Sequence, residues 1–209
     1  MCKCNCGCSC CCKDNDVPRT VIDVSAWQEG IDMKQVKAEG VYGVIVKLGE
    51  NYRETETARK QIFEALDAGL KVGVYYYSHA MSIDEAKSEG EWFNNKLAEI
   101  GLVDYHLQLG AWFDCEHRPF LDNANAQEIT DAITAFICEI KNIHCVGVYG
   151  SYSMLWDETY MLSQHPDIPV WSAQYNDTDD YAPYNNKMWQ FTDSYDCAGF
   201  KVDANKLYY

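Results

Sequence analysis

The sequence predicts an α/β fold with eight strands, and three observations lead to this prediction. Strand-like and helix-like stretches alternate along the chain from about residue 20 onward. The strand-like stretches are nearly continuous apolar runs, which is typical of strands covered on both faces. Alternation of this kind favours a parallel sheet. Eight such strands suggest a closed barrel, and the pattern alone leaves a doubly wound open sheet as the alternative.

The expected elements follow one another in a regular order. Residues 32–39 and 55–68 read as helices that end at Gly40 and Gly69, since glycine commonly follows the last turn of a helix. A further helical turn is expected after the fifth strand, through Leu162. The expected strands, in chain order, are residues 20–25, 42–48, 70–77, 109–114, 145–150, 169–175, 188–192 and 200–203.

Two longer helices carry start signals of the capping-box type. Ser82 begins one of them, and Glu85 three residues later is expected to complete a capping box. Asn125 and Glu128 repeat this pattern before a helix that runs to about Lys141. Helices are therefore expected between the first five or six strands.

Charge and composition exclude several classes of function. The chain has 209 residues, 47% of them hydrophobic, which fits one domain with a full core. Its 32 acidic and 17 basic residues give a net charge of −15, which repels nucleic acid and anionic membranes. The chain has no run of roughly 20 apolar residues and no signal-peptide core, so membrane insertion is not expected. We expect the protein to stay in the cytoplasm until it is released.

The first 18 residues form a separate segment by composition. Seven of the 11 cysteines lie within the first 12 residues, and Pro18 ends the segment. We expect residues 1–18 to be a disordered tail and residues 19–209 to form the single folded domain. The tail has three open interpretations: no role, binding of a soft metal by several thiolates, or lipid attachment or crosslinking. The four scattered cysteines are expected to be reduced thiols.

A pair of carboxylates marks the end of the fourth expected strand. Asp114 and Glu116 are two residues apart, so on a strand both side chains share a face. Chemistry in a βα barrel occurs where strands end. Two close carboxylates push their pKa values apart, which gives the acid and the anion that glycoside hydrolysis needs. The alternative is a pair of helix-capping or solvated acids.

Two further acids are expected at the same mouth. Asp23 lies inside the apolar first strand, and Asp203 ends the last strand. The first and last strands of a closed barrel are neighbours, so both acids would converge on Asp114 and Glu116. Taken singly, each could instead be a turn or capping residue.

Aromatic residues occur near the same strand ends, where their faces would suit the apolar C–H faces of sugar rings. Each of them could equally be a core residue. The set comprises Trp27, Tyr75, Trp112, Trp171, Tyr175 and Trp189.

Other chemistries fit the sequence less well. There is no G-x-S-x-G elbow, P-loop or H-E-x-x-H motif, and the five histidines lack metal-ligand spacing. Cys115 lies between the two acids and should face away from them, in the core. His117 could support Glu116 or be an ordinary loop residue. No metal or organic cofactor is expected.

The sequence resembles glycoside hydrolase family 25, the Chalaropsis-type and phage-type muramidases. The similarity extends over residues 20–209 and rests on the order of its motifs, which is highly specific. The motifs are V-I-D-V-S-A-W-Q, G-V-Y-G-V-I-V-K-L-G, G-L-K-V-G-V-Y-Y-Y-S, W-F-D-C-E, V-G-V-Y-G, P-V-W-S-A-Q-Y, M-W-Q-F-T and K-V-D-A-N.

The resemblance implies a single-domain, modified TIM-like (β/α)5(β)3 barrel. It implies cleavage of the β-1,4 bond between N-acetylmuramic acid and N-acetylglucosamine in bacterial peptidoglycan. Glu116 would be the general acid and Asp114 its carboxylate companion, with Asp23 and Asp203 as the other acids of the pocket. The saccharide groove would be lined by Tyr75, Trp171, Tyr175 and Gln190, with Trp189 as a further candidate from the aromatic set.

Two mechanisms are open under this resemblance. Asp114 could form a covalent intermediate, or it could stabilise participation by the 2-acetamido group of the substrate. The second is favoured because that group is present in this substrate. One rival function is a catalytically silent barrel that binds glycan. Another is a different barrel glycosidase, such as a chitinase, but residues 108–116 lack the D-x-x-D-x-D-x-E run typical of chitinases. A third is a metal-handling protein defined by its tail, which the four matched acids of the barrel do not favour.

The resemblance also sets expectations about partners. Peptidoglycan is the expected partner and the protein is expected to be a monomer. The chain ends at Tyr209 without the wall-binding module of many relatives, and the Cys-rich tail stands where secreted relatives have a signal peptide. These departures fit a phage or prophage endolysin that depends on a holin for release.

Removal of the tail should leave the chemistry intact. Deleting residues 1–16 should change the turnover of soluble wall fragments by less than about threefold, because these residues supply no expected catalytic acid. The measurement is steady-state turnover by the truncated and full-length proteins. A folded truncated protein without turnover would contradict the expectation.

Overall fold

The computed structural model describes residues 18–178 and 186–208, and in it eight strands close into a barrel. The sheet order is β1-β9-β8-β7-β6-β5-β4-β2-β3, and pairing of β1 with β2 closes the ring. The two-residue β3 is a short addition to β2 outside the ring. The strands are β1 (Arg19–Val24), β2 (Gly43–Glu50), β3 (Arg53–Glu54), β4 (Lys71–Tyr77), β5 (Ala111–Asp114), β6 (Val146–Ser151), β7 (Val170–Ala173), β8 (Asn186–Cys197) and β9 (Phe200–Leu207). The expected barrel is confirmed, and the open sheet is excluded.

The strand directions correct one expectation. Parallel pairing runs from β1 through β2, β4, β5, β6 and β7 to β8, but β9 is antiparallel to both β8 and β1. The alternation of strands and helices predicted parallel pairing, and β9 is the strand that departs from it. The reason is the two-residue turn at Ala198 and Gly199, where φ is 48° and 82°. Such a turn can join only antiparallel strands, and a positive φ at both positions is the mark of a tight hairpin.

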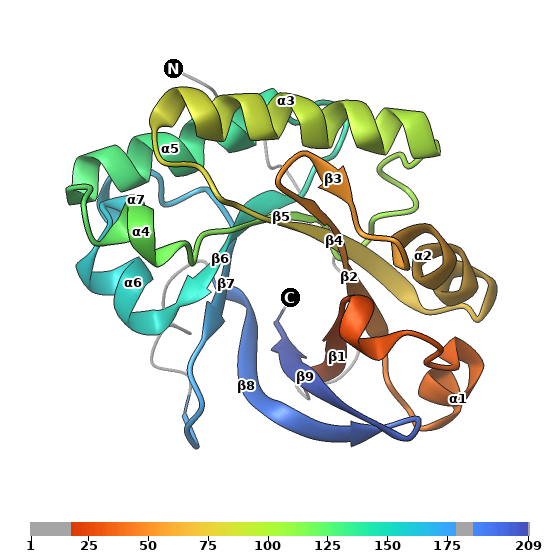
Figure 1. The fold of residues 1–209 in the computed structure, drawn as a ribbon. Coiled ribbons are helices and arrows are strands. Elements are labelled where there is room, and N and C mark those ends of the chain that lie inside the picture. Colours follow the sequence, from red (N-terminus) through yellow and green to blue (C-terminus); the bar gives the residue numbers. More distant parts are fainter. Residues whose placement is uncertain (1–17, 179–185, 209) are drawn as a thin grey trace.

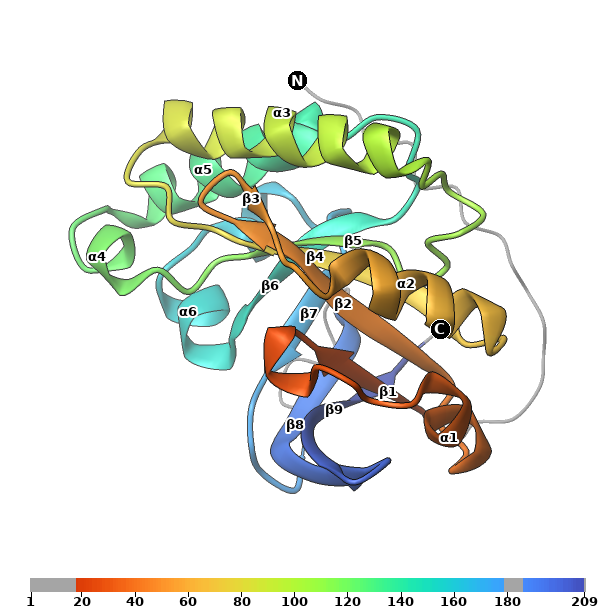
Figure 2. The same ribbon diagram turned by 45° about the vertical axis from the view of Figure 1, so that its right-hand side comes forward.

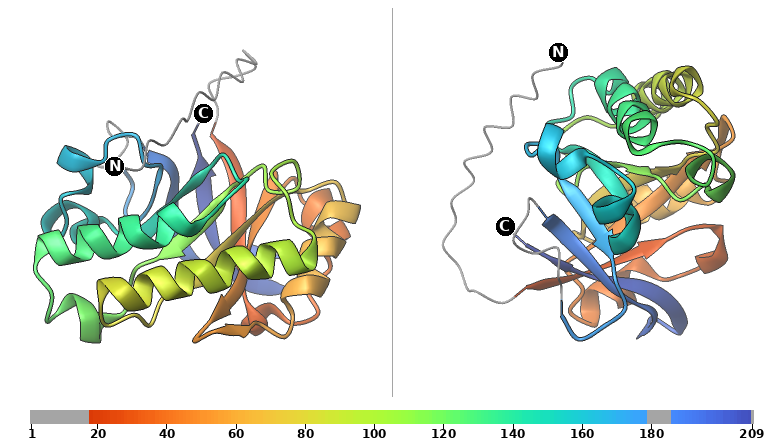
Figure 3. Two further views of the ribbon diagram at one scale, coloured as in Figure 1. Left: turned by 90° about the horizontal axis from the view of Figure 1, so that it is seen from above. Right: turned by 90° about the vertical axis from the view of Figure 1, so that its left-hand side faces the viewer.

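Helices cover the outside of one half of the barrel. The long helices α3 and α5 lie side by side across it, while β8 and β9 form the opposite wall (Figures 1 and 3). The helices are η1 (Ala26–Gln28), α1 (Met33–Ala38), α2 (Ala58–Asp67), α3 (Ile83–Ile100), α4 (Arg118–Leu121), α5 (Ala126–Glu139), α6 (Tyr152–Asp157) and α7 (Met161–Gln164). The helices between the first strands were expected, whereas α4 and β3 were not.

The helix start signals are borne out in different degrees. Asn125 and Glu128 form a complete capping box at the start of α5. Ser82 caps α3 by accepting a hydrogen bond from the Glu85 N–H at 3.2 Å. The Glu85 carboxylate, however, accepts from the Met81 N–H at 2.7 Å rather than from Ser82. The expected capping box at Ser82 is therefore only half formed.

The core has two parts, separated by the barrel wall. The larger part lies between the strands and the helices. The smaller part fills the inside of the barrel, and two of its tryptophans are almost completely buried. Its buried members are Val21, Ile45, Leu109, Trp112, Tyr149, Trp171 and Met188. Because alternate residues of a strand share a face, the residues two positions after Val21, Ile45 and Trp112 also face the barrel axis.

The expected tail, up to residue 17, lies outside the described residues. Within the described ranges, each helix is too short or too polar to span a lipid bilayer.

The packing of α3 on α5 leads to a stability prediction at Gly90. A Cβ atom at Gly90 would lie 2.7 Å from the Phe136 carbonyl oxygen of α5. Helix propensity alone favours alanine over glycine by about 1 kcal/mol. We expect the steric clash to outweigh this gain, so that Gly90→Ala lowers the free energy of unfolding by about 1–3 kcal/mol, the usual scale for overpacking.

Urea denaturation would measure this effect. Ser88→Ala, at an exposed position of the same helix, is the matched control and should change stability by less than about 0.5 kcal/mol. A Gly90→Ala protein as stable as the wild type would show that α3 and α5 are not packed as tightly as described.

Candidate active site

Four carboxylates converge at one end of the barrel. Asp114 ends β5, and Glu116 follows two residues later. Asp23 of β1 and Asp203 of β9 are direct partners in the antiparallel register. This pairing follows from barrel closure, which brings the first and last strands side by side (Figure 2). Asp23 and Asp114 are buried, with 7% and 5% of their surfaces exposed, so their environment is largely protein.

Tyr75 of β4 is close enough to all four acids for their charges to affect its pKa. Burial raises the pKa of its phenol well above the usual value, and the negative charges of Asp23, Asp114, Asp203 and Glu116 raise it further. Its ring meets the Trp171 ring edge-on, with 6.2 Å between the centroids. The acids expected from the sequence are therefore gathered around one half-buried tyrosine.

Amide groups hold the Asp23 carboxylate in place. Its Oδ2 accepts hydrogen bonds from Asn205 Nδ2 at 2.9 Å and from Gln190 Nε2 at 3.1 Å. Asn205 Oδ1 in turn accepts a hydrogen bond from Trp171 Nε1 at 2.7 Å. Each of these polar groups is buried, so each needs a partner inside the protein. The result is a fixed network under the acids.

Gln190 extends this network to two tyrosines. Its Oε1 accepts hydrogen bonds from the Tyr149 hydroxyl at 2.9 Å and from the Tyr175 hydroxyl at 2.8 Å. Tyr149 belongs to the barrel interior, whereas 54% of the Tyr175 surface is exposed. Gln190 thus links the buried floor of the site to an aromatic ring that solvent can reach.

Asp23 and Asp203 behave as a pair that shares a proton. Burial and the charge of Asp203 raise the pKa of Asp23 to about 7, and the hydrogen bonds from Asn205 and Gln190 oppose this shift. Burial also raises the pKa of Asp203, with Asp193 as the next cause. A side-chain hydrogen bond between the two carboxyl groups raises the pKa of Asp23 and lowers that of Asp203. The shared proton is therefore held by Asp23.

Asp114 and Glu116 form the second pair. Burial raises the pKa of Glu116 and raises the pKa of Asp114 well above its usual value. The next cause is the charge of Glu116 for Asp114 and the charge of Asp203 for Glu116. Asp114 Oδ1 is buried and has no hydrogen-bond partner among the described residues. An unpaired buried carboxylate oxygen is costly, so a donor supplied by a ligand would favour the ionised form of Asp114. The proton of the pair would then belong to Glu116.

Lys47 is a site residue that the sequence analysis missed. It lies on β2 two residues after the interior residue Ile45, and 17% of its side chain is exposed. Its Nζ is 3.1 Å from Glu50 Oε1 and 5.0 Å from the centre of the Tyr77 ring. Its positive charge lowers the pKa of Asp114, against the effect of burial. The signal was available, because Lys47 is a charged residue inside an apolar strand, as Asp23 is.

Trp112 and Trp189 are both almost completely buried. Trp112 is 1% exposed and donates through Nε1 to the Leu109 carbonyl at 2.7 Å. Trp189 is 3% exposed, donates to the Gln174 carbonyl at 2.7 Å, and packs against Lys206. Adjacent strand residues face opposite sides, so Trp189 points away from the side on which Gln190 meets Asp23.

Cys115 and His117 also have positions that can be compared with expectation. Cys115 faces the helix-covered core, as expected from its place between two inward-facing acids. The His117 ring meets the His79 ring, with 5.0 Å between the centroids, and burial with the neighbouring His79 lowers the His117 pKa. His79 is also paired with Glu50 at 3.0 Å.

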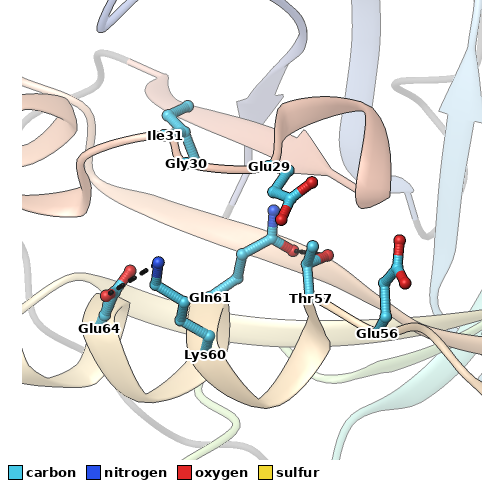
Figure 4. A pocket seen from close by; sticks show the side chains of 8 residues that line it. All are labelled: Glu29, Gly30, Ile31, Glu56, Thr57, Lys60, Gln61 and Glu64. Carbon is cyan, nitrogen blue, oxygen red and sulfur yellow. Dashed lines mark hydrogen bonds and ion pairs between the residues drawn. The ribbon is translucent and has the colours of Figure 1, made fainter.

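A separate pocket lies outside the barrel, between α2 and the turn that follows η1. It has a volume of about 260 Å³ and contains none of the four acids. Figure 4 shows its side chains, including Gln61 on α2 opposite Glu29.

Within residues 18–178 and 186–208, no three His, Cys, Asp or Glu side chains are arranged to hold a metal ion.

The sequence profile described as "Glycosyl hydrolases family 25" matches residues 22–200. A search of curated protein sequences finds no significant match. Among solved structures, the modular autolysin LytC from Streptococcus pneumoniae in complex with a synthetic peptidoglycan ligand is similar, with a TM-score of 0.78 and 22% identity. The likeness covers 93% of this chain, which spans about half, 48%, of LytC.

Two structures of comparable length are also similar. The bacterial lysozyme from Streptomyces coelicolor has a TM-score of 0.71 and 21% identity, with 92% of this chain and 93% of that chain covered. A family 25 glycosyl hydrolase from Bacillus anthracis has a TM-score of 0.73 and 16% identity, with 93% and 91% covered. At these identities the structural likeness concerns the fold.

The raised pKa of Asp23 leads to a pH-dependent stability prediction. Folding keeps Asp23 protonated up to about pH 7, whereas the unfolded chain ionises near pH 3.8. The stabilisation that protonated Asp23 gives to the folded protein is therefore fully present below about pH 4. It is lost as the pH rises to 7. Asp23→Asn does not titrate, so we expect its stability relative to the wild type to grow by at least about 1 kcal/mol between pH 4 and 8, since one pKa unit corresponds to about 1.4 kcal/mol.

Urea unfolding at several pH values would test this prediction. Asp67→Asn, at an exposed position of α2, is the matched control and should show no such growth. A constant difference between Asp23→Asn and the wild type from pH 4 to 8 would contradict the shared-proton description.

Proposed function

The chain belongs to glycosyl hydrolase family 25, and we propose that it hydrolyses the β-1,4 bond between N-acetylmuramic acid and N-acetylglucosamine in bacterial peptidoglycan. The observation that carries this proposal is the convergence of Asp23, Asp114, Glu116 and Asp203 at the end of the barrel where chemistry occurs in such folds. LytC, which has the same fold, was solved with a synthetic peptidoglycan ligand. We propose peptidoglycan as the partner and a lytic role at the wall, as in an endolysin or autolysin.

Glu116 is the general acid in this proposal. Protonation of the glycosidic oxygen requires a carboxylic acid that keeps its proton near neutral pH. Burial and the charge of Asp203 both act in this direction on Glu116. Glu116 is also half-buried rather than fully enclosed, so a glycosidic oxygen can approach it.

Asp114 is the companion carboxylate, and its unpaired Oδ1 supports one of the two mechanisms. The acetamido N–H of the substrate can donate to this oxygen, which favours ionised Asp114 and orients the acetamido group. The acetamido oxygen then attacks C1 as the glycosidic bond breaks and Glu116 gives its proton to the leaving oxygen. Water subsequently attacks C1, the bond between C1 and the acetamido oxygen breaks to restore the acetamido group, and the proton lost by the water returns to Glu116. The covalent route through Asp114 is the alternative.

Asp23 and Asp203 adjust the field around the reacting pair. They share a proton, so together they place about one negative charge near Glu116. That charge stabilises the oxocarbenium-like transition state and helps to keep the proton on Glu116. The positive charge of Lys47 lowers the pKa of Asp114 and so favours its ionised carboxylate form.

The saccharide groove involves the aromatic candidates in different ways. Tyr75 and Tyr175 are accessible enough to contact a sugar ring directly. Trp171 is 1% exposed, so its role is to support Tyr75 and to hold Asn205. Gln190 positions Tyr175 and Asp23 at the same time.

The decisive experiment is product analysis after digestion of purified peptidoglycan. We expect the new reducing ends to be N-acetylmuramic acid, identified by mass spectrometry after borohydride reduction. Reducing ends that are only N-acetylglucosamine, or release of peptides alone, would overturn the muramidase proposal. Binding of peptidoglycan without any cleavage would instead identify a silent glycan-binding barrel.

Substitution of the general acid should abolish most of the activity. Glu116→Gln should lower kcat by at least about 10²-fold, the usual scale for losing a general acid. Asp114→Asn should also be severe, because the amide cannot stabilise positive charge on the substrate. Steady-state turnover with a melting curve for each variant would separate lost chemistry from lost folding. A folded Glu116→Gln protein with wild-type kcat would exclude Glu116 as the acid.

Asp203→Asn should have a milder effect that shows in the pH profile. The charge of Asp203 raises the pKa of Glu116, so its removal lowers that pKa. The alkaline limb of the kcat profile, where the acid loses its proton, should therefore move to lower pH. Asp23→Asn should likewise be milder than Glu116→Gln and should shift the profile. Unchanged profiles in both variants would show that the Asp23–Asp203 pair does not act on the acid.

A further inference from the structure

Trp27 is unusually exposed for a tryptophan. Its exposed fraction is 90%, larger than that of any other large hydrophobic residue in the described part of the chain. It lies on η1, four residues after Asp23 and directly beyond the end of β1. An indole offers a large apolar face, and leaving it in water forgoes the stability that burial would give. The exposure of the Trp27 indole therefore suggests that a ligand covers it.

The turn that carries Trp27 is braced from inside. Ser25 Oγ accepts from the Trp27 N–H at 3.3 Å, and the Gln28 side chain accepts from the Ser25 N–H at 3.0 Å. Gln61 of α2, seen in Figure 4, donates to the backbone carbonyls of Ser25 at 2.9 Å and Gln28 at 3.2 Å. A rigid turn loses little freedom when a ligand binds, which favours a binding role over a loose surface loop.

The same turn is connected to the strands that carry two of the acids. The Gln28 side chain donates to the Lys201 carbonyl on β9 at 3.4 Å, two residues before Asp203. Asp203 is the register partner of Asp23. Trp27 therefore stands at the rim of the acid site, at its β1–β9 side.

A second exposed aromatic ring stands at the other side of these strands. Tyr175 follows β7, and in the sheet β7 is separated from β1 by β8 and β9. A chain of sugars that crosses the acid-bearing mouth of the barrel could contact Tyr175 at the β7 side and Trp27 at the β1 side. A polymeric glycan is the ligand that can reach both rings while one of its bonds lies at Glu116.

We propose that Trp27 is a stacking platform for a pyranose ring of the glycan strand, at a position beyond the sugars that flank the cleaved bond. This inference rests on the proposed function, because it takes the substrate to be a polymer of amino sugars. The ligand class is an uncharged N-acetylhexosamine ring, whose C–H face matches an indole face. Such binding is insensitive to the net charge of −15.

The test compares long and short substrates. Wild type, Trp27→Ala, Trp27→Phe and Phe63→Ala would be assayed on uncrosslinked glycan strands and on the tetrasaccharide of two disaccharide repeats. Phe63 is the matched control, since it is an exposed aromatic residue, 43% accessible, on α2. The readout is the ratio of kcat/KM on strands to kcat/KM on the tetrasaccharide.

We expect Trp27→Ala to lower this ratio at least about fivefold through KM on strands, the scale of truncating a contact tryptophan. Trp27→Phe should recover most of the ratio, and Phe63→Ala should leave it unchanged. Titration of Glu116→Gln with glycan strands should change the indole fluorescence, and the double variant with Trp27→Ala should lose most of that change.

Each contrary result has a distinct meaning. Wild-type cleavage with an unchanged ratio in Trp27→Ala overturns the platform while the proposed function stands. Equal losses on both substrates also overturn it, because they assign Trp27 to the shape of the acid site. A wild-type dimer that Trp27→Ala dissociates would assign the indole to a second copy. Absence of wild-type cleavage on either substrate would refute the proposed function itself.

Discussion

Closure of the barrel by β9 is the constraint on which the site depends. β9 enters antiparallel between β8 and β1, and this pairing sets Asp203 directly opposite Asp23. When two carboxyl groups are buried at paired positions of adjacent strands, ionising both carries a large free-energy cost. They therefore share a proton. The hydrogen bonds from Asn205 and Gln190 hold the Asp23 carboxyl group in place and oppose the rise of its pKa. A slip of one residue in this register would turn Asp203 to the outside of the barrel.

The rest of the site is supported by layers of residues that do not themselves react. Buried aromatic side chains fill the interior of the barrel. The buried amides of Gln190 and Asn205 lie between these aromatic residues and the acids. Trp171 shows the arrangement, since it packs against Tyr75 and also donates to Asn205. Positioning of this kind matters because catalytic groups must be held close to their working geometry by neighbours whose own conformations are fixed.

The sequence predicted the parts of the fold and site that depend on local spacing. The two-residue spacing of Asp114 and Glu116 fixed their common face, and barrel closure brought in Asp23 and Asp203. Trp189 was a candidate because it is an aromatic residue near a strand end, and which side of the sheet it faces depends on the alternation along β8. Tyr149, Asn205 and Lys47 were missed because their value comes from partners on other strands, which spacing along one strand does not reveal. The direction of β9 depended on the two-residue turn at Ala198 and Gly199, a signal that lies between the strands.

The packed interior of the barrel has a consequence for the order of events during turnover. Trp112, Trp171 and Met188 are almost completely buried inside the barrel. Their side chains fill the interior beneath the acids, so the barrel is not a pore. Because the barrel interior is filled, water cannot reach the reacting carbon through the barrel and must come from the mouth where the glycan lies. The hydrolytic water can enter only after the departing sugar has vacated its half of that opening. Catalysis would therefore follow a compulsory sequence, with the leaving fragment released before hydrolysis and the retained fragment released after it.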